Sequence, residues 1–179
     1  ALVHGFKIPL GGHLLSINQG VFLSRMVSQL RAESSVYRFP IYGSNVAAVL
    51  KSLSPAGNKL GPMIAIAMQG LLFAVPISFL NVNWLSVLLG MALLSLWAFI
   101  QPFMTLYLIY GHDLIDAARF FWEKMQESTG LLPFSTHSMA VALAVLVVFK
   151  VVLAMIAGGF AYSASEAHFK KYQDLVMRK

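Results

Sequence analysis

Residues 138–162 read SMAVALAVLVVFKVVLAMIAGGFAY and contain a single charged side chain, Lys150, near the middle. About 20 apolar residues are needed for an α-helix to cross the hydrocarbon core of a bilayer, so this stretch is long enough to span a membrane. A cation near the centre of such a helix costs roughly 2.5–3.5 kcal/mol. We therefore expect Lys150 to face a protein interior, a polar cavity or a partner. The alternative is a stem that snorkels to the membrane surface or pairs with a backbone carbonyl.

The composition of the whole chain points the same way. Of its 179 residues, 58% are hydrophobic and 11% are charged, whereas soluble domains carry about 25% charged residues. We predict a single integral-membrane domain over residues 1–179. The net charge of +6 fits basic loops that face an anionic leaflet or ligand, and it gives no reason to expect nucleic acid as a partner. The absence of cysteine excludes disulfides and thiolate metal sites.

Two further segments, Leu60–Leu80 and Trp84–Tyr110, are apolar and long enough to be spans. Residues 17–30 and 40–53 also have helical character, but each is short and polar for a span. We expect protein to shield these two weaker helices, or tilt or breaks to accommodate them, because exposed polar groups are costly in lipid.

Residues 113–127 place apolar side chains at helical spacing, with charged residues on the other face. This pattern is typical of an amphipathic helix at a membrane interface. Residues 1–6 read as the end of a helix whose beginning is missing. The predicted fold is therefore an all-α polytopic membrane helix bundle of five helices, with a truncated first helix and one interfacial amphipathic helix.

Basic residues near the ends of spans indicate the orientation in the membrane. Four of them follow the last span: Lys170, Lys171, Arg178 and Lys179. They favour a cytoplasmic C-terminus, and we expect the protein in a bacterial inner membrane. If the weaker helices also cross, the outer face then carries three connections rich in functional side chains: residues 7–13, 51–59 and 113–127.

No sequence motif supports catalysis. The five histidines lack the spacing of a helix-borne zinc site, no Gly-x-Ser-x-Gly turn is present, and no glycine-rich phosphate loop leads into a helix. We therefore expect no catalytic residues, no metal site and no cofactor. An integral-membrane enzyme without a recognisable motif is the least favoured alternative.

Polar residues inside the apolar segments are the better candidates for a site. Buried amides need hydrogen-bond partners, either on another helix or on a ligand. Such residues are Gln69, Trp97, Gln101 and Lys150 in the spans, with Asn18, Gln19 and Asn45 in the weaker helices. Together with the outer connections they give the candidate substrate-binding set: Lys7, His13, Lys51, Lys59, Gln69, Gln101 and Lys150.

The order of these segments resembles the substrate-binding S-components of energy-coupling factor transporters. In that layout, residues 1–6 would end the first helix, residues 7–15 would form the loop that closes over the ligand, and the remaining segments would supply helices two to six. The resemblance implies a subunit in the lipid bilayer that captures a small nutrient such as a vitamin, with an anion favoured by the lysines. It also implies a coupling subunit and an ATPase module as protein partners.

A second hypothesis comes from the same features. The protein would be a non-catalytic structural or accessory subunit, and other subunits of a larger membrane complex would shield Lys150 and the weaker helices. An enclosed polar site would favour substrate capture, whereas an exposed polar face would favour the accessory subunit.

Overall fold

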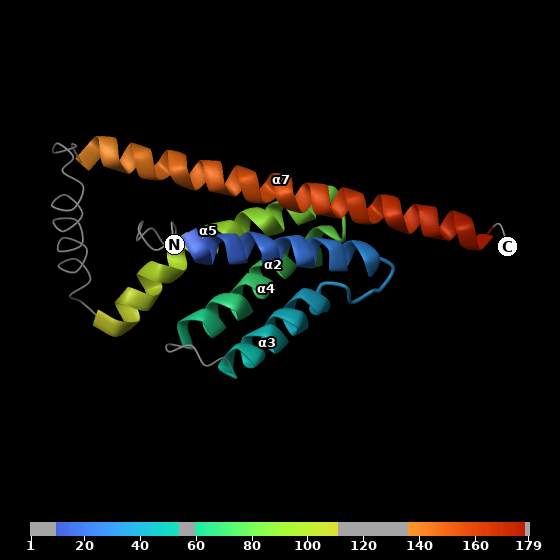
Figure 1. Ribbon diagram of the computed structural model, residues 1–179, viewed down its shortest axis with the longest axis horizontal. Helices are drawn as coiled ribbons and strands as arrows, with labels where there is room; N and C mark the ends of the chain where they lie inside the picture. Colours follow the sequence, from blue (N-terminus) through green and yellow to red (C-terminus); the bar gives the residue numbers. More distant parts are fainter. Residues whose placement is uncertain (1–9, 54–59, 111–135, 178–179) are drawn as a thin grey trace, which may run out of the picture.

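The computed structural model of the chain describes residues 10–53, 60–110 and 136–177, in which all regular secondary structure is helical. The helices in these ranges are α2 (Leu10–Gln29), α3 (Arg38–Ser52), α4 (Leu60–Leu80), α5 (Trp84–Tyr110) and α7 (Thr136–Met177) (Figure 1). They confirm the predicted all-α architecture of five helices. The predicted truncated first helix (residues 1–6) and interfacial helix (residues 113–127) lie outside the described residues.

Three segments of the described helices are long and apolar enough to cross a membrane: Leu60–Leu80, Trp84–Gln101 and Ala144–Phe169. They suggest an integral membrane protein. The two weaker helices, α2 and α3, are not among the segments long and apolar enough to cross a membrane. With 15 residues, α3 is about 22 Å long, which is shorter than a hydrocarbon core of about 30 Å.

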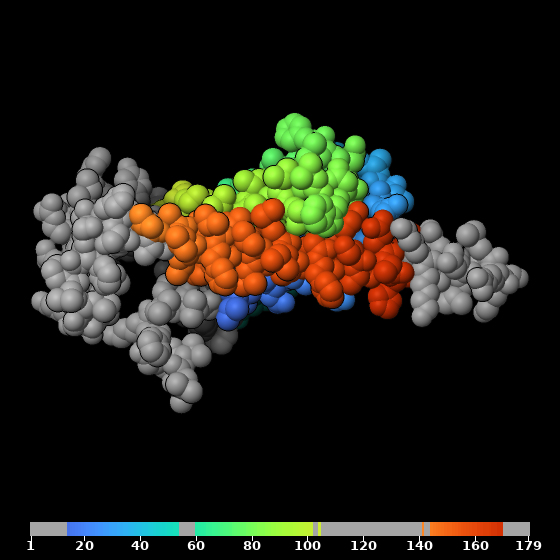
Figure 2. All heavy atoms as spheres, turned by 90° about the horizontal axis from the view of Figure 1, so that it is seen from above, coloured from blue at the N-terminus to red at the C-terminus, as the bar shows by residue number. Residues whose placement is uncertain are grey.

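The outward face of α7 is apolar along the predicted span. Phe149, Ile156 and Phe160 expose 65%, 63% and 77% of their surface, and the orange-red band of α7 in Figure 2 runs along one face of the molecule beside α5. A soluble protein rarely leaves such a continuous apolar face uncovered. Such a face is suited to contact with a lipid bilayer.

The helix α2 packs against α3, α4, α5 and α7. It therefore occupies the centre of the bundle, although its sequence is more polar than that of the spans. Leu23, Ser24 and Val27 are fully or almost fully buried, whereas Asn18 and Arg25 are exposed. The expectation that protein shields this helix is confirmed for one of its faces.

The prediction that residues 7–15 form a loop is wrong for residues 10–15, which form the first turns of α2. Pro9 directly precedes this helix, and proline is favourable at a helix start because the first N–H groups have no intrahelical acceptor. Gly11 and Gly12 each disfavour a helix by about 1 kcal/mol. A helix nevertheless satisfies the backbone polar groups internally, and this gain is largest in apolar surroundings.

The prediction that the last helix ends near Tyr162 is also wrong, because α7 continues to Met177. Residues 163–177 contain neither glycine nor proline, and their alanine, glutamate, lysine and glutamine residues favour helix. The C-terminal end of α7 extends past the other helices (Figure 1).

Two connections meet at the same end of the bundle. Residues 30–37 join α2 to α3 and residues 81–83 join α4 to α5. Residues of both connections line one cavity together with Tyr162 of α7. The second connection is tight: Asn81 adopts φ 58°, and the side chain of Asn83 accepts a hydrogen bond from the Ser86 N–H at 2.8 Å, which caps the start of α5.

Candidate functional site

Three helices are held in register by the side chain of Met91, which is fully buried in α5. A Cβ atom added to Gly20 of α2 would lie 2.5 Å from the Met91 sulfur, and one added to Gly158 of α7 would lie 2.3 Å from the Met91 Cγ. The neighbouring Gly90 of α5 lies close against Phe73 of α4, whose ring a Cβ atom at Gly90 would meet at 2.9 Å. These contacts define one level of the bundle, from which other residues can be located along each helix.

Several polar side chains lie in the half of the bundle towards the start of α7, while the buried Ser24, Ser28, Ser86 and Ser165 lie in the other half. At 1.5 Å per residue, Ser16 of α2 lies about 6 Å from the Met91 level, Trp97 of α5 about 9 Å and Lys150 of α7 about 12 Å, all in the same direction. Gln69 of α4 precedes Phe73 by four residues and lies on the same side of that level. We call Ser16, Gln19, Gln69, Trp97 and Lys150 the polar layer.

Gln19 connects three helices within the polar layer. Its side-chain amide N–H groups donate to the Ser44 hydroxyl of α3 at 3.0 Å and to the Ile66 carbonyl of α4 at 3.2 Å. This amide therefore links α2 to α3 and α4, so its hydrogen bonds serve helix packing rather than ligand binding.

We expect Gln19→Leu to lower the free energy of unfolding by about 1 kcal/mol, since hydrogen bonds between membrane helices contribute about 0.6 kcal/mol on average and up to about 1.7 kcal/mol. Unfolding in detergent micelles measures the effect. Asn18→Leu is the matched control, because Asn18 is the exposed neighbour and should tolerate the change. Equal stability of the two variants would contradict the role of Gln19.

Two other members of the polar layer have buried polar atoms without a partner. The Ser16 hydroxyl and the Trp97 indole nitrogen make no hydrogen bond within the described part of the chain, although the two residues expose only 2% and 8% of their surface. Ser24, two turns along α2, shows the usual solution and donates to the Gly20 carbonyl at 2.8 Å. An unpaired buried donor costs about 1–3 kcal/mol, so a hydrogen-bond acceptor at Ser16 or Trp97 would be stabilising. The Ser28 hydroxyl, outside the polar layer on α2, also lacks a partner within the described residues.

Lys150 lies on the side of α7 that faces the bundle. Its position continues the stripe formed by Ala154, Gly158 and Tyr162, all of which are buried. The Lys150 ammonium lies 5.0 Å from the centre of the Phe99 ring of α5, within the range of a cation–π contact. The side chain is partly buried.

The other predicted site residues are more widely spread. Gln101 lies one turn beyond Trp97 on α5, and Lys51 lies in the last turn of α3. His13 lies in α2 rather than in a loop, one turn before Ser16. Lys7 and Lys59 lie outside the described residues. Ser16 was missed by sequence reasoning, because nothing in the sequence distinguishes it from the other serines.

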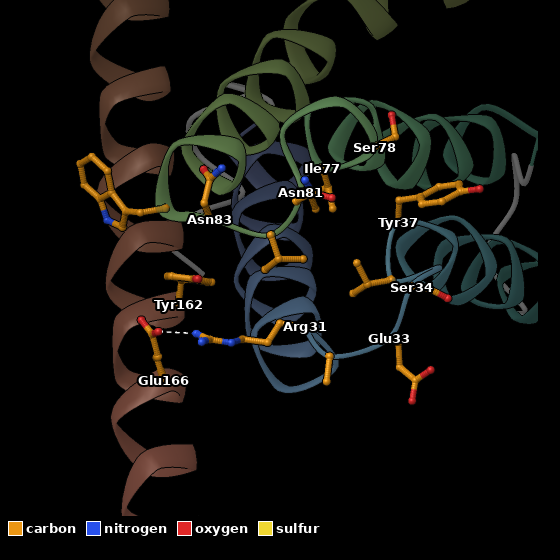
Figure 3. A pocket seen from close by; sticks show the side chains of 14 residues that line it. Arg31, Glu33, Ser34, Tyr37, Ile77, Ser78, Asn81, Asn83, Tyr162 and Glu166 are labelled. Atoms are coloured by element: carbon orange, nitrogen blue, oxygen red, sulfur yellow. Dashed lines mark hydrogen bonds and ion pairs between the residues drawn. The ribbon is translucent and has the colours of Figure 1, made fainter.

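A cavity of about 590 Å³ lies at the opposite end of the bundle and is lined by none of the predicted site residues. Figure 3 shows Arg31, at the end of α2, reaching Glu166 of α7, with which it forms an ion pair. Tyr37, Ser78, Asn81 and Tyr162 lie around the same cavity. The ion pair is partly exposed, and such pairs contribute only about 0–1 kcal/mol to stability.

Comparisons with protein-family models, with curated proteins and with solved structures found no match to this chain.

Proposed function

We propose that the protein is the substrate-capturing subunit of a membrane uptake system for a small nutrient. The observation that supports this proposal is that Ser16 and Trp97 have buried donors without partners in the described part of a helix bundle with membrane-spanning character. A third such donor, on Ser28, lies towards the other end of α2. Ligand sites between helices of a bundle combine an apolar lining with a few polar groups that converge. A bound ligand would supply the acceptors that these donors lack.

The subunit has no catalysis of its own in this proposal. A coupling subunit and an ATPase module supply the energy, as the resemblance to S-components implies. The protein lies in a bacterial inner membrane with its C-terminus in the cytoplasm, so the polar layer lies nearer the outer surface than the cavity beside Arg31. Because the chain contains no cysteine, single cysteines at Ser34 and Leu53 would test this orientation. A membrane-impermeant maleimide should label only Leu53→Cys in intact cells. Labelling of only Ser34→Cys would show the opposite orientation, with the C-terminus outside.

The experiment on the proposed function is ligand retention by the full chain purified in a mild detergent. Native mass spectrometry should find a co-purified small molecule, or a panel of water-soluble vitamins should contain a compound that raises the thermal unfolding temperature. Trp97→Phe should weaken this binding, because it removes the N–H donor while keeping an aromatic ring. Trp84→Phe is the control, since Trp84 is 56% exposed. A chain that retains nothing and binds no compound would contradict the proposal.

One observation favours the accessory subunit as a second candidate. Asn18 and Arg25 on α2 and Asn45 on α3 face outward, and a neighbouring chain would shield them from lipid. Cross-linking in native membranes distinguishes the two functions. A stable complex that survives purification and contains no small molecule would favour the accessory subunit.

A further inference from the structure

The cavity beside Arg31 lies at the ends of the three candidate spans. The span of α4 ends at Leu80 and that of α5 begins at Trp84, so in a bilayer the connection between them, residues 81–83, lies at the membrane surface. This connection lines the cavity, and so does Tyr162, at which the apolar run of α7 ends. Tryptophan and tyrosine are enriched at this depth, because their rings are apolar and carry one polar atom. The cavity therefore lies at the depth of the lipid headgroups.

The lining of this cavity combines an apolar floor with polar sides. Val36 and Ile77 are the buried apolar residues of the lining and expose 7% and 1% of their surface. Figure 3 shows Arg31 and Glu166 on one side of the cavity and Tyr37 on the other. Its volume of about 590 Å³ lies within the range of small-molecule pockets, about 300–1,000 Å³. The cavity is thus large enough for a small polar group such as a lipid headgroup.

The charged groups of the lining are one guanidinium, on Arg31, and two carboxylates, on Glu33 and Glu166, so the net charge of the lining is −1. The ion pair of Arg31 with Glu166 joins one guanidinium nitrogen to one carboxylate oxygen, and a guanidinium has five N–H donors, so it can bind a second anion as well. Glu33 is exposed and forms no ion pair with the described residues. A ligand with only a negative charge is repelled here, whereas one that brings a cation together with its anion complements both signs.

We propose that this cavity binds the headgroup of a membrane phospholipid that carries a primary ammonium, as in phosphatidylethanolamine. The phosphate accepts hydrogen bonds from the guanidinium of Arg31, and the ammonium donates to the carboxylates of Glu33 and Glu166. The side-chain carbonyl of Asn81 is a further acceptor in the lining. A choline headgroup has the same charges but no N–H donor, so it satisfies these acceptors less well. The cavity is separate from the polar layer, and the inference does not depend on the proposed function.

The test compares three phospholipids with identical acyl chains and with ethanolamine, choline or glycerol headgroups. Native mass spectrometry of the full chain in a mild detergent measures how much of each lipid stays bound when all three are added in equal amounts. The ethanolamine lipid is expected to bind about tenfold more tightly than either of the others, because hydrogen bonds between charged groups are stronger than neutral ones. Soluble glycerophosphoethanolamine separates a lipid from a soluble ligand. It should displace the lipid only at a much higher concentration, because it lacks the acyl chains.

Variants of the charged residues assign the binding to this cavity. Glu33→Gln should reduce the preference for ethanolamine over choline several-fold while the fold is kept, because Glu33 is exposed and forms no ion pair with the described residues. Arg31→Gln should weaken binding of both lipids, since it removes the partner of the phosphate. It also breaks the ion pair with Glu166, so Glu33→Gln is the decisive variant. Arg25→Gln is the control for loss of a guanidinium, because Arg25 is exposed on α2 and does not line the cavity.

Several results would overturn the inference. Equal binding of the three lipids, or a preference for the glycerol lipid, would contradict a headgroup site for an ammonium. A preference for ethanolamine that is unchanged in Glu33→Gln would contradict its place in this cavity. Displacement by glycerophosphoethanolamine at the concentration of the lipid itself would show a soluble amine as the ligand instead of a lipid. Retention of a small nutrient is measured separately, so failure of this inference leaves the proposed function intact.

Discussion

Gly70→Ala is expected to lower the free energy of unfolding by about 2 kcal/mol, although alanine is the better helix former. A Cβ atom at this position would lie 2.2 Å from the Ser44 hydroxyl oxygen and 2.6 Å from the Pro40 carbonyl oxygen. Both belong to α3, so the two helices would have to separate. Overpacking of this kind costs typically 1–3 kcal/mol. Unfolding in detergent micelles, followed by circular dichroism, measures the loss.

Gly43→Ala is the matched control for this prediction. Gly43 lies in α3 beside Ser44, and a Cβ atom there meets nothing within 4 Å. The variant should gain about 0.5–1 kcal/mol, because glycine in a helix interior is less favourable than alanine. Ser44→Gly should only partly rescue Gly70→Ala, since the Pro40 carbonyl is backbone and stays in place. Stability of Gly70→Ala at or above that of the native chain would contradict the close packing of α3 on α4.

Gly158→Val is expected to cost about 2–3 kcal/mol. The added side chain would meet Met91, and this methionine cannot turn towards α2 because Gly20 lies equally close on that side. Met91→Ala alone should also destabilise the protein, since truncation of a buried methionine to alanine costs about 2–5 kcal/mol.

The double variant Gly158→Val with Met91→Ala tests the contact directly. If the two side chains compete for one space, the double variant should be more stable than the sum of the single effects by about 1–3 kcal/mol. Additive losses would show that the two positions do not share the space. Gly159→Ala is the neighbouring control, because its nearest atoms are the end of the Leu88 side chain at 3.2 Å and the Trp84 ring at 3.3 Å, and a small shift relieves these contacts.

Much of the architecture could be predicted from local sequence. The bounds of α4 and α5 agree with the predicted segments Leu60–Leu80 and Trp84–Tyr110. Each combines an apolar run of spanning length with a clear break, such as the Asn81–Asn83 link between them. Hydropathy was a poorer guide to the ends of α2 and α7. It indicates where a helix can leave lipid, but the end of a helix depends on backbone hydrogen bonding, which continues through the polar residues 163–177.

The candidate site divides in the same way. Sequence alone determined that Gln69, Gln101 and Lys150 are polar residues within apolar helices, because composition makes them exceptional there. Only the tertiary structure decided that Gln19 has partners on two other helices while Ser16 and Trp97 have none. Partners on other helices depend on the register between helices, and glycines that admit Met91 and Phe73 determine that register through close packing. The central position of α2 is likewise a property of the packed bundle, since its own polar sequence would favour an edge.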